Sequence, residues 1–312
     1  MKKTIITYVI LCFLIPISIE AKKNPFGNGL NWELTEDGTL IISGNGEMPD
    51  FYYYGKWIIK APWYNNREKI RRVVIDEGIT SIGNESFRAP WASNYIIEEV
   101  VLSSTIERIG KYAFLGCRKL KKITFNDGLY SIEDEAFGSC NLDKIVLPSS
   151  VCKIGEYCFS GNPLTSVVLS DNITTIPTGA FMNCKLLKQI KYPSKLKRIE
   201  GDAFGFSSIE GDRQGCLEYI DLPSGVEYIG SYAFCGNVAK YLKLPESIRE
   251  IGKNAFAFSS RYAKPIVNFK GEILSLPLLI NENNAVDYGL DKNAVWYFQN
   301  RVSNLMYPLC NK

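Results

Sequence analysis

Histidine is absent from all 312 residues of the chain. Its absence removes the commonest general base, the usual partner of a nucleophilic serine or cysteine, and the commonest zinc ligand. The chain also lacks a Cys-x-x-Cys pair, so neither a cysteine protease nor a Cys/His metal site is expected. Carboxylate chemistry of the glycosidase kind needs no histidine, but no Asp/Glu pair stands out from the charged residues between the repeats. We therefore expect no enzyme activity, no cofactor and no metal.

A strong charge of one sign is also missing. Lys and Arg number 36 against 33 Asp and Glu, and the net charge of +3 is spread along the chain without a concentrated basic block. Nucleic-acid binding requires a clustered basic stripe, so nucleic acid is not an expected partner. Beyond the N-terminus, no apolar run reaches the length that a bilayer span requires, and we expect no membrane span.

The N-terminus carries the one prominent apolar run. Met1-Lys2-Lys3 precedes residues 5–19, which are almost uninterruptedly apolar, and the small residue Ala21 follows. A basic start, a short apolar core and a small residue at the cleavage point are typical of a secretory signal peptide. Residues 1–21 are therefore predicted to be a signal peptide, and the mature protein is expected at the cell surface, in the periplasm or secreted.

An aliphatic residue lies five positions before a phenylalanine eight times in the chain. The pairs are Ile82/Phe87, Ile109/Phe114, Ile132/Phe137, Ile154/Phe159, Ile176/Phe181, Ile199/Phe204, Ile229/Phe234 and Ile251/Phe256. Successive phenylalanines are 27, 23, 22, 22, 23, 30 and 22 residues apart. Self-similarity at such a period predicts a solenoid, in which each repeat buries its apolar face against the next.

Each repeat contains a short apolar triplet that ends seven residues before the isoleucine. In Ile145-Val146-Leu147, alternation with period two directs the first and third side chains inward and the second outward. A turn rich in Pro, Ser, Asp or Gly follows, and the chain then returns inward. A small residue precedes each phenylalanine, and we place this pair on a short helical or 3₁₀ turn that closes the far side. The pattern predicts a β-rich solenoid.

The repeat from Leu142 to Phe159, with the sequence LDKIVLPSSVCKIGEYCF, resembles the BspA-type leucine-rich repeat of bacterial surface proteins. The resemblance covers roughly residues 67–276, and the segment from Trp32 to Gly44 is similar to the lead-in of that family. It implies a leucine-rich-repeat solenoid of about eight to nine repeats. It also implies a binding role at the cell surface, often adhesion to host proteins, and no catalytic residues.

Residues outside the period are expected to close the two ends of the solenoid. Residues 22–66 include two apolar stretches around Asp37-Gly38, a strong hairpin signal, and predict an N-terminal β-hairpin cap. Residues 277–312 are expected to form the C-terminal cap, which leaves residues 67–276 as the solenoid. We expect one cooperative body instead of separate domains.

The outward positions of the triplets form the surface that we expect to bind a partner. Neighbouring strands lie about 4.8 Å apart, so these side chains are expected to form continuous rows. The candidate residues are Lys122, Lys144, Val146, Val168, Lys191, Tyr219, Asp221, Tyr241 and Lys243. Aromatic anchors among charges are typical of protein-binding patches, which predicts an extracellular protein as the partner. The alternative is that Val and Tyr are present only because they fit a pleated surface.

A second aromatic cluster lies before the repeats, at residues 51–57. Tyr52, Tyr53, Tyr54 and Trp57 could stack on sugar rings, which makes a carbohydrate-binding module the alternative function. A cap must also bury large apolar side chains, and aromatic rings do so efficiently. The sequence leaves both interpretations open.

Cys12 lies in the leader, which leaves eight of the nine cysteines in the exported chain. Cys117, Cys140 and Cys184 share one repeat position, three residues after the phenylalanine. Recurrence at one position predicts buried thiols that act as small apolar side chains. Export also permits disulfides, and Cys117 and Cys140 lie on neighbouring repeats, so a bridge between these two stays open.

Overall fold

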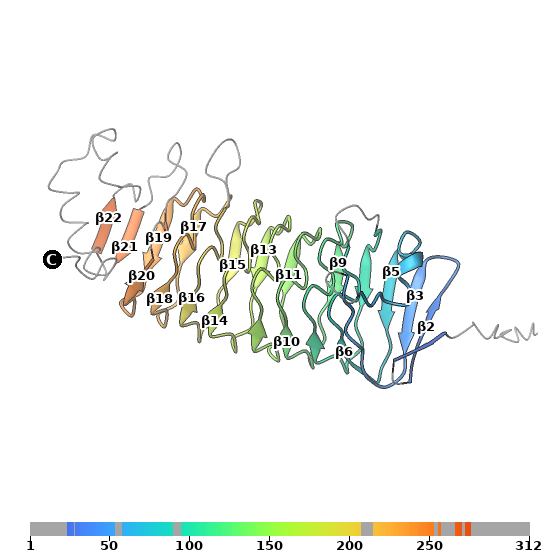
Figure 1. Cartoon of the computed structure of the whole chain (residues 1–312). Helices are drawn as coiled ribbons and strands as arrows, with labels where there is room; N and C mark the ends of the chain where they lie inside the picture. The colour runs from blue at the N-terminus through green and yellow to red at the C-terminus, as the bar shows by residue number, and fades with distance from the viewer. Residues whose placement is uncertain are drawn as a thin grey trace, which may run out of the picture.

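The computed structural model describes residues 24–27, 29–53, 58–89, 95–206, 215–252 and 255–256, and the backbone of β21 (Ile266–Phe269) and β22 (Glu272–Ser275). In this part of the chain the repeats coil into an elongated solenoid, with the N-terminal strands at one end and β21 and β22 toward the other (Figure 1). The predicted signal peptide at residues 1–21 and the predicted cap at residues 277–312 lie outside the described residues.

Each repeat contributes one strand to each of two β layers. The first layer holds the apolar triplets, in β5 (Arg72–Ile75), β7 (Glu99–Val101), β9 (Lys122–Thr124), β11 (Lys144–Val146), β13 (Ser166–Val168), β15 (Gln189–Lys191), β17 (Tyr219–Asp221), β19 (Tyr241–Leu244) and β21. The second layer holds the repeated isoleucines, in β6 (Ile79–Ile82), β8 (Arg108–Ile109), β10 (Ser131–Ile132), β12 (Lys153–Ile154), β14 (Thr175–Ile176), β16 (Arg198–Ile199), β18 (Tyr228–Ile229) and β20 (Glu250–Ile251), preceded by β4 (Gly46–Glu47). The triplets thus form strands, as their alternation predicts.

Neighbouring repeats pair in parallel, so equivalent residues lie side by side. Val73 pairs with Val100 in the first layer, and Ile132 pairs with both Ile109 and Ile154 in the second. The pairing divides the first layer into three sheets, β1-β2-β3-β5-β7-β9, β11-β13-β15 and β17-β19-β21-β22, of which β1 (Asn24–Phe26), β2 (Leu30–Leu34) and β3 (Thr39–Ser43) precede the repeats. The outward rows expected from the sequence are therefore continuous within each sheet, and not along the whole layer.

The repeated phenylalanines form one continuous stack through the core. The rings of Phe87, Phe114, Phe137, Phe159, Phe181, Phe204, Phe234 and Phe256 lie nearly parallel, with centroids 5.0 to 5.6 Å apart. All of these side chains are buried. The stack runs through both points at which strand pairing in the first layer is interrupted, so it joins the three sheets into one core.

The far-side turn at each phenylalanine is short, as expected, but it does not form a 3₁₀ helix. In the seven turns where it is described, the residue two positions before the ring has a left-handed backbone, with φ of 53° at Tyr157 and 60° at Gly179, which ends any helical run. The N–H of Phe159 instead donates to the carbonyl of Ala180 in the next repeat at 2.9 Å, and the same bond recurs along the stack. Within the described residues, the one 3₁₀ helix is η1 (Tyr64–Asn66), ahead of the repeats.

Asparagine or cysteine occupies the position three residues after the phenylalanine in five of the repeats. Asn162 Nδ2 donates to the carbonyls of Phe137 and Phe159, at 2.8 and 2.9 Å, and its Oδ1 accepts from the Leu142 N–H at 3.0 Å. The thiol of Cys140 lies 3.2 Å from the carbonyl of Phe114, its equivalent acceptor on the preceding repeat. These cysteines are therefore buried, as predicted, but their thiols also act as weak donors to the carbonyl of the phenylalanine in the preceding repeat.

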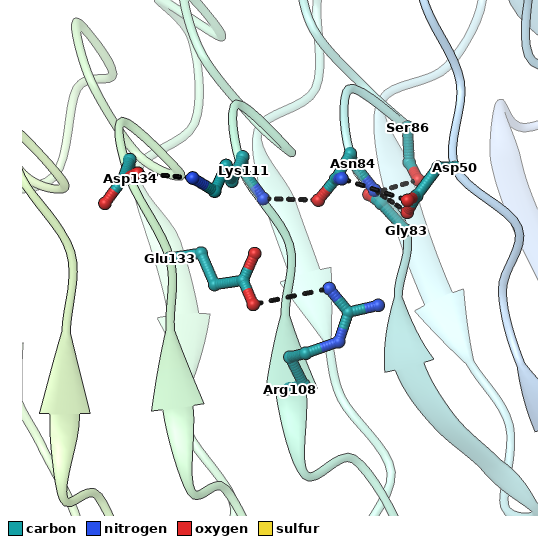
Figure 2. A network of polar contacts seen from close by, with 8 residues as sticks. All are labelled: Asp50, Gly83, Asn84, Ser86, Arg108, Lys111, Glu133 and Asp134. Carbon is teal, nitrogen blue, oxygen red and sulfur yellow. Dashed lines mark hydrogen bonds and ion pairs between the residues drawn. The ribbon is translucent and has the colours of Figure 1, made fainter.

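Polar side chains join the repeats at the turn that follows the second layer. Asp50 Oδ1 accepts the Asn84 N–H and Asn84 Oδ1 accepts the Lys111 N–H, each at 2.8 Å. Lys111 Nζ then pairs with Asp134 Oδ2 at 2.8 Å, on the next repeat (Figure 2). Each contact lies on the outside of a turn, so we assign this network to holding successive turns in register.

The segment before the repeats contains the predicted hairpin. β2 pairs antiparallel with β3 around Asp37-Gly38, and β3 pairs in parallel with β5, the first repeat strand. Trp63 then takes the ring position that precedes Phe87 in the stack, with centroids 5.3 Å apart and 20° between the planes. The aromatic stack thus begins before the first repeat.

Candidate protein-binding face of the solenoid

The candidate residues lie on the outer side of the first layer, where the alternation places them. Lys122, Lys144 and Lys191 are exposed, and Val146 keeps 64% of its surface accessible. The residue between each outward pair is inward: Ile145 is 2% exposed. The structure therefore agrees with the in–out assignment made from the triplets.

Val146, Val168 and Lys191 form one row across the middle sheet. Val146 pairs with Val168, and Val168 pairs with Lys191, through the parallel register of β11, β13 and β15. Lys144 lies beside Ser166 in the adjacent row. This sheet therefore presents two apolar side chains next to exposed ammonium groups, and Val146 is the more exposed of the two valines.

Tyr219 and Tyr241 form an outward aromatic pair on β17 and β19. Their ring centroids are 6.5 Å apart, Tyr219 is 65% exposed, and Tyr241 is half-buried. In the neighbouring row, Lys243 Nζ pairs with Asp221 Oδ1 at 3.1 Å. The four side chains combine exposed aromatic area with a charge pair, an arrangement common in protein-binding surfaces.

Lys122 belongs to a different part of the face, at the edge of the first sheet. Glu99 on β7 pairs with Lys122 at 2.5 Å and with Arg72 on β5 at 3.1 Å. The hydrogen bond from Lys122 and the two positive charges hold the pKa of Glu99 below its usual value. The charge of Lys122 is thus already neutralised within the protein, which sets it apart from Lys144 and Lys191.

The aromatic segment considered for glycan binding is largely turned inward where it is described. Tyr53 is 8% exposed and Phe51 is 4% exposed, whereas Tyr52 keeps 42% of its surface accessible. Desolvation raises the pKa of the Tyr53 hydroxyl to about 12. Tyr54 and Trp57 lie outside the described residues.

A groove on the loop edge was not anticipated from the sequence. It encloses about 630 Å³, and its walls include Arg118, Ser139, Asn141, Asn183, Lys185 and Leu186; we call it the loop-edge groove. Arg118, Asn141 and Lys185 each lie four residues after a repeat phenylalanine, so a comparison of that position across repeats could have found them. Arg118 and Lys185, which are far apart in the sequence, thus line the same groove.

The described cysteines are free thiols, and most of them are buried. Burial raises the pKa of the Cys184 thiol to about 12 and that of Cys117 well above its ordinary value. Since the thiolate is the reactive form, iodoacetamide at pH 8 should modify exposed Cys152 in the native protein and leave Cys117 and Cys184 unmodified. Mass mapping before and after addition of denaturant checks this.

A Cys117–Cys140 disulfide would change the result that is obtained in denaturant. Both residues would then resist alkylation in denaturant until a reductant was added.

Neither metal chemistry nor a membrane-crossing helix is found in the described part of the chain. No cluster of three His, Cys, Asp or Glu side chains there could hold a metal ion. No helix in the same residues combines the length and the apolarity needed to cross a bilayer.

Known proteins share the repeat and the fold. Residues 91–210 and 213–271 match the BspA type leucine rich repeat region, in six copies. A leucine-rich repeat protein from Eubacterium ventriosum superposes with a TM-score of 0.54 at 25% identity, over 74% of this chain and 61% of that one. One from Bacteroides ovatus gives a TM-score of 0.54 at 24% identity, over 73% and 61%. The chain thus spans less than two thirds of either protein.

No curated protein matches the sequence. The match to the repeat family nevertheless covers more than half of the chain, and the solenoid of parallel strands is the fold of the two structures that superpose on it. The chain belongs to the BspA-type leucine-rich-repeat family.

Proposed function

We propose that this protein is an exported, non-catalytic solenoid that binds another protein through the outer side of its first layer. The observation that carries the proposal is the Tyr219–Tyr241 pair beside the Asp221–Lys243 ion pair. Exposed tyrosines are enriched at the energetic centres of protein interfaces, where they bury much area at little cost in side-chain entropy. The middle sheet extends this surface with Lys144, Val146, Val168 and Lys191.

The architecture supports a recognition role in preference to catalysis. In the three sheets of the first layer the outward side chains vary while the inward ones repeat, which is the arrangement that solenoids use for extended contacts. The chain has no histidine to act as a general base. Adhesion to a host protein at the cell surface is the biological form of this binding that the family resemblance favours.

The proposed function also assigns a role to each segment of the chain, as signal peptide, cap or solenoid. Residues 1–21 direct export as a signal peptide, and residues 22–66 cap the N-terminal end of the solenoid formed by residues 67–276. Residues 277–312 cap the other end. The mature protein then acts at the cell surface, in the periplasm or after secretion.

Binding of the purified protein to an array of extracellular proteins and glycans tests the function. The double variant Tyr219→Ala, Tyr241→Ala is expected to weaken binding to a captured protein by tenfold or more, since loss of a hot-spot pair typically costs at least about 2 kcal/mol. Tyr130→Ala is the matched control, because Tyr130 is 58% exposed and adjoins the second layer.

Circular dichroism must show that all the variants are folded. Equal loss of binding in the Tyr130 control would contradict a site on the first layer. Binding of glycan alone, unchanged in the double variant but lost in Tyr52→Ala, would replace the proposal with the aromatic carbohydrate-binding alternative.

A further inference from the structure

The loop-edge groove runs across five successive repeats, along the axis of the solenoid. Its walls come from the loops that precede β9, β11, β13 and β15, with Phe206 from the loop before β17, and none of its lining residues lies in a strand. Arg118 stands at the first of these loops and Lys185 at the fourth. Three steps of the aromatic stack, 5.2, 5.6 and 5.6 Å, separate the two repeats.

The groove is positively charged and contains no carboxylate. Arg118 and Lys185 are both exposed, and no Asp or Glu lies among its lining residues. The same two loops also carry Lys119, Lys121 and Lys188, all exposed. In the part of these four loops that follows the repeat phenylalanine, Asp143 is the single carboxylate. Like charges at this density repel one another, so an anionic ligand would be attracted here.

These cations differ from their counterparts on the flanking repeats. There, Arg71 pairs with Glu98 at 3.6 Å and Lys240 pairs with Glu218 at 2.9 Å, each across one repeat step. Within the described part of the chain, Arg118, Lys119, Lys121, Lys185 and Lys188 form no ion pair. Their charge is therefore available to a ligand.

The lining also suits hydroxyl groups and sugar rings. Ser139, Asn141 and Asn183 place a hydroxyl and two amides between the cationic ends. Leu186, which is 47% exposed, adds an apolar wall against which the C–H face of a sugar can pack. Arg clusters also recognise acidic peptides, so the side-chain amides and the Leu186 wall are the features that favour a sugar over a peptide here.

We propose that the loop-edge groove binds a linear sulfated glycan, with Arg118 and Lys185 each holding a sulfate. The guanidinium of Arg118 can pair with two oxygens of one sulfate, and the Lys185 ammonium acts as a point charge. Asn141 and Asn183 bind hydroxyls of the intervening sugars. This site lies outside the Tyr219–Tyr241 surface, so the protein can bind a glycan and a protein partner separately.

Affinity of the purified protein for a size-defined heparin oligosaccharide tests the proposal, by calorimetry at two salt concentrations. The double variant Arg118→Gln, Lys185→Gln is expected to bind about tenfold or more weakly than the wild type, and salt should weaken wild-type binding. The matched control is Lys69→Gln, Lys153→Gln, which removes the same charge from exposed positions away from the groove. The Tyr219→Ala, Tyr241→Ala protein should bind the oligosaccharide as the wild type does.

Three further probes distinguish the glycan from other anions: the desulfated oligosaccharide, poly-glutamate and a duplex DNA of similar length. Preference for the sulfated chain, lost only in the Arg118/Lys185 variant, supports the groove. Equal weakening in the Lys69/Lys153 control would overturn it, because the attraction would then come from net charge alone. Tighter binding of poly-glutamate or DNA, or no binding of the sulfated chain, would also overturn it.

Discussion

Phe159→Ala is expected to lower the free energy of unfolding by about 3–5 kcal/mol, the usual cost of truncating a buried phenylalanine. Phe159 is 0% exposed and stacks between Phe137 and Phe181, with both centroids 5.6 Å away. Alanine would remove both ring contacts and leave a cavity that the backbone of neighbouring repeats prevents from collapsing. The stack is also the element that runs through the interruptions between the sheets.

Chemical denaturation followed by circular dichroism measures this loss. Because each repeat contacts only its neighbours, the variant is also expected to unfold less cooperatively, with a broader transition than the wild type. Tyr130→Ala, at an exposed aromatic position, should change stability by less than about 1 kcal/mol. A change below 1 kcal/mol for Phe159→Ala would remove this ring from the core.

Trp63→Ala is expected to have a comparable effect, about 3–5 kcal/mol, at the N-terminal end of the same stack. Trp63 is 0% exposed; it stacks on Phe87 and meets the edges of Phe26 and Phe51 at 5.3 and 5.7 Å. Its Nε1 also donates to the carbonyl of Ser86 at 3.1 Å. The truncation would expose one face of Phe87 and leave that carbonyl without its partner, so the first repeats should unfold before the rest.

Hydrogen exchange resolved by peptide measures where the loss occurs. Protection should fall first in β2, β3 and β5, while the repeats from β13 onward keep theirs. Trp63→Phe is the informative control: it keeps a ring but removes the donor, and should cost about 1–2 kcal/mol. Uniform loss of protection along the solenoid would argue against a capping role for this segment.

Much of the fold could be predicted from the sequence, because the pattern that specifies it is local. The alternation in Ile145-Val146-Leu147 is enough to place Val146 outward, and the structure leaves it 64% exposed with Ile145 buried. The spacing of the phenylalanines likewise predicts that each repeat places one ring at the equivalent position in the core. Period and alternation are repeated many times, so an error in any single repeat would not have changed the result.

Several features could not be predicted, because they depend on the backbone between the pattern positions. The left-handed residue at Tyr157 ends the far-side turn before a 3₁₀ helix can form, and nothing in the identity of tyrosine signals that conformation. The Cys140 thiol donates a hydrogen bond to the Phe114 carbonyl, a contact that the recurrence of cysteine at this position does not predict. The place of Trp63 at the head of the phenylalanine stack was not predicted from the sequence either.

The sequence by itself determined the solenoid, the inward and outward sides of its strands, and its family, since every repeat must bury the same apolar face to be stable. Only the tertiary structure decided which outward side chains become neighbours. Arg118 and Lys185 share the loop-edge groove because nearly equal repeat lengths bring equivalent loops into line, although the two residues are far apart in the chain. The hydrophobic effect constrains buried positions alike in every repeat, whereas surface positions vary freely, so their grouping emerges only when the chain is coiled.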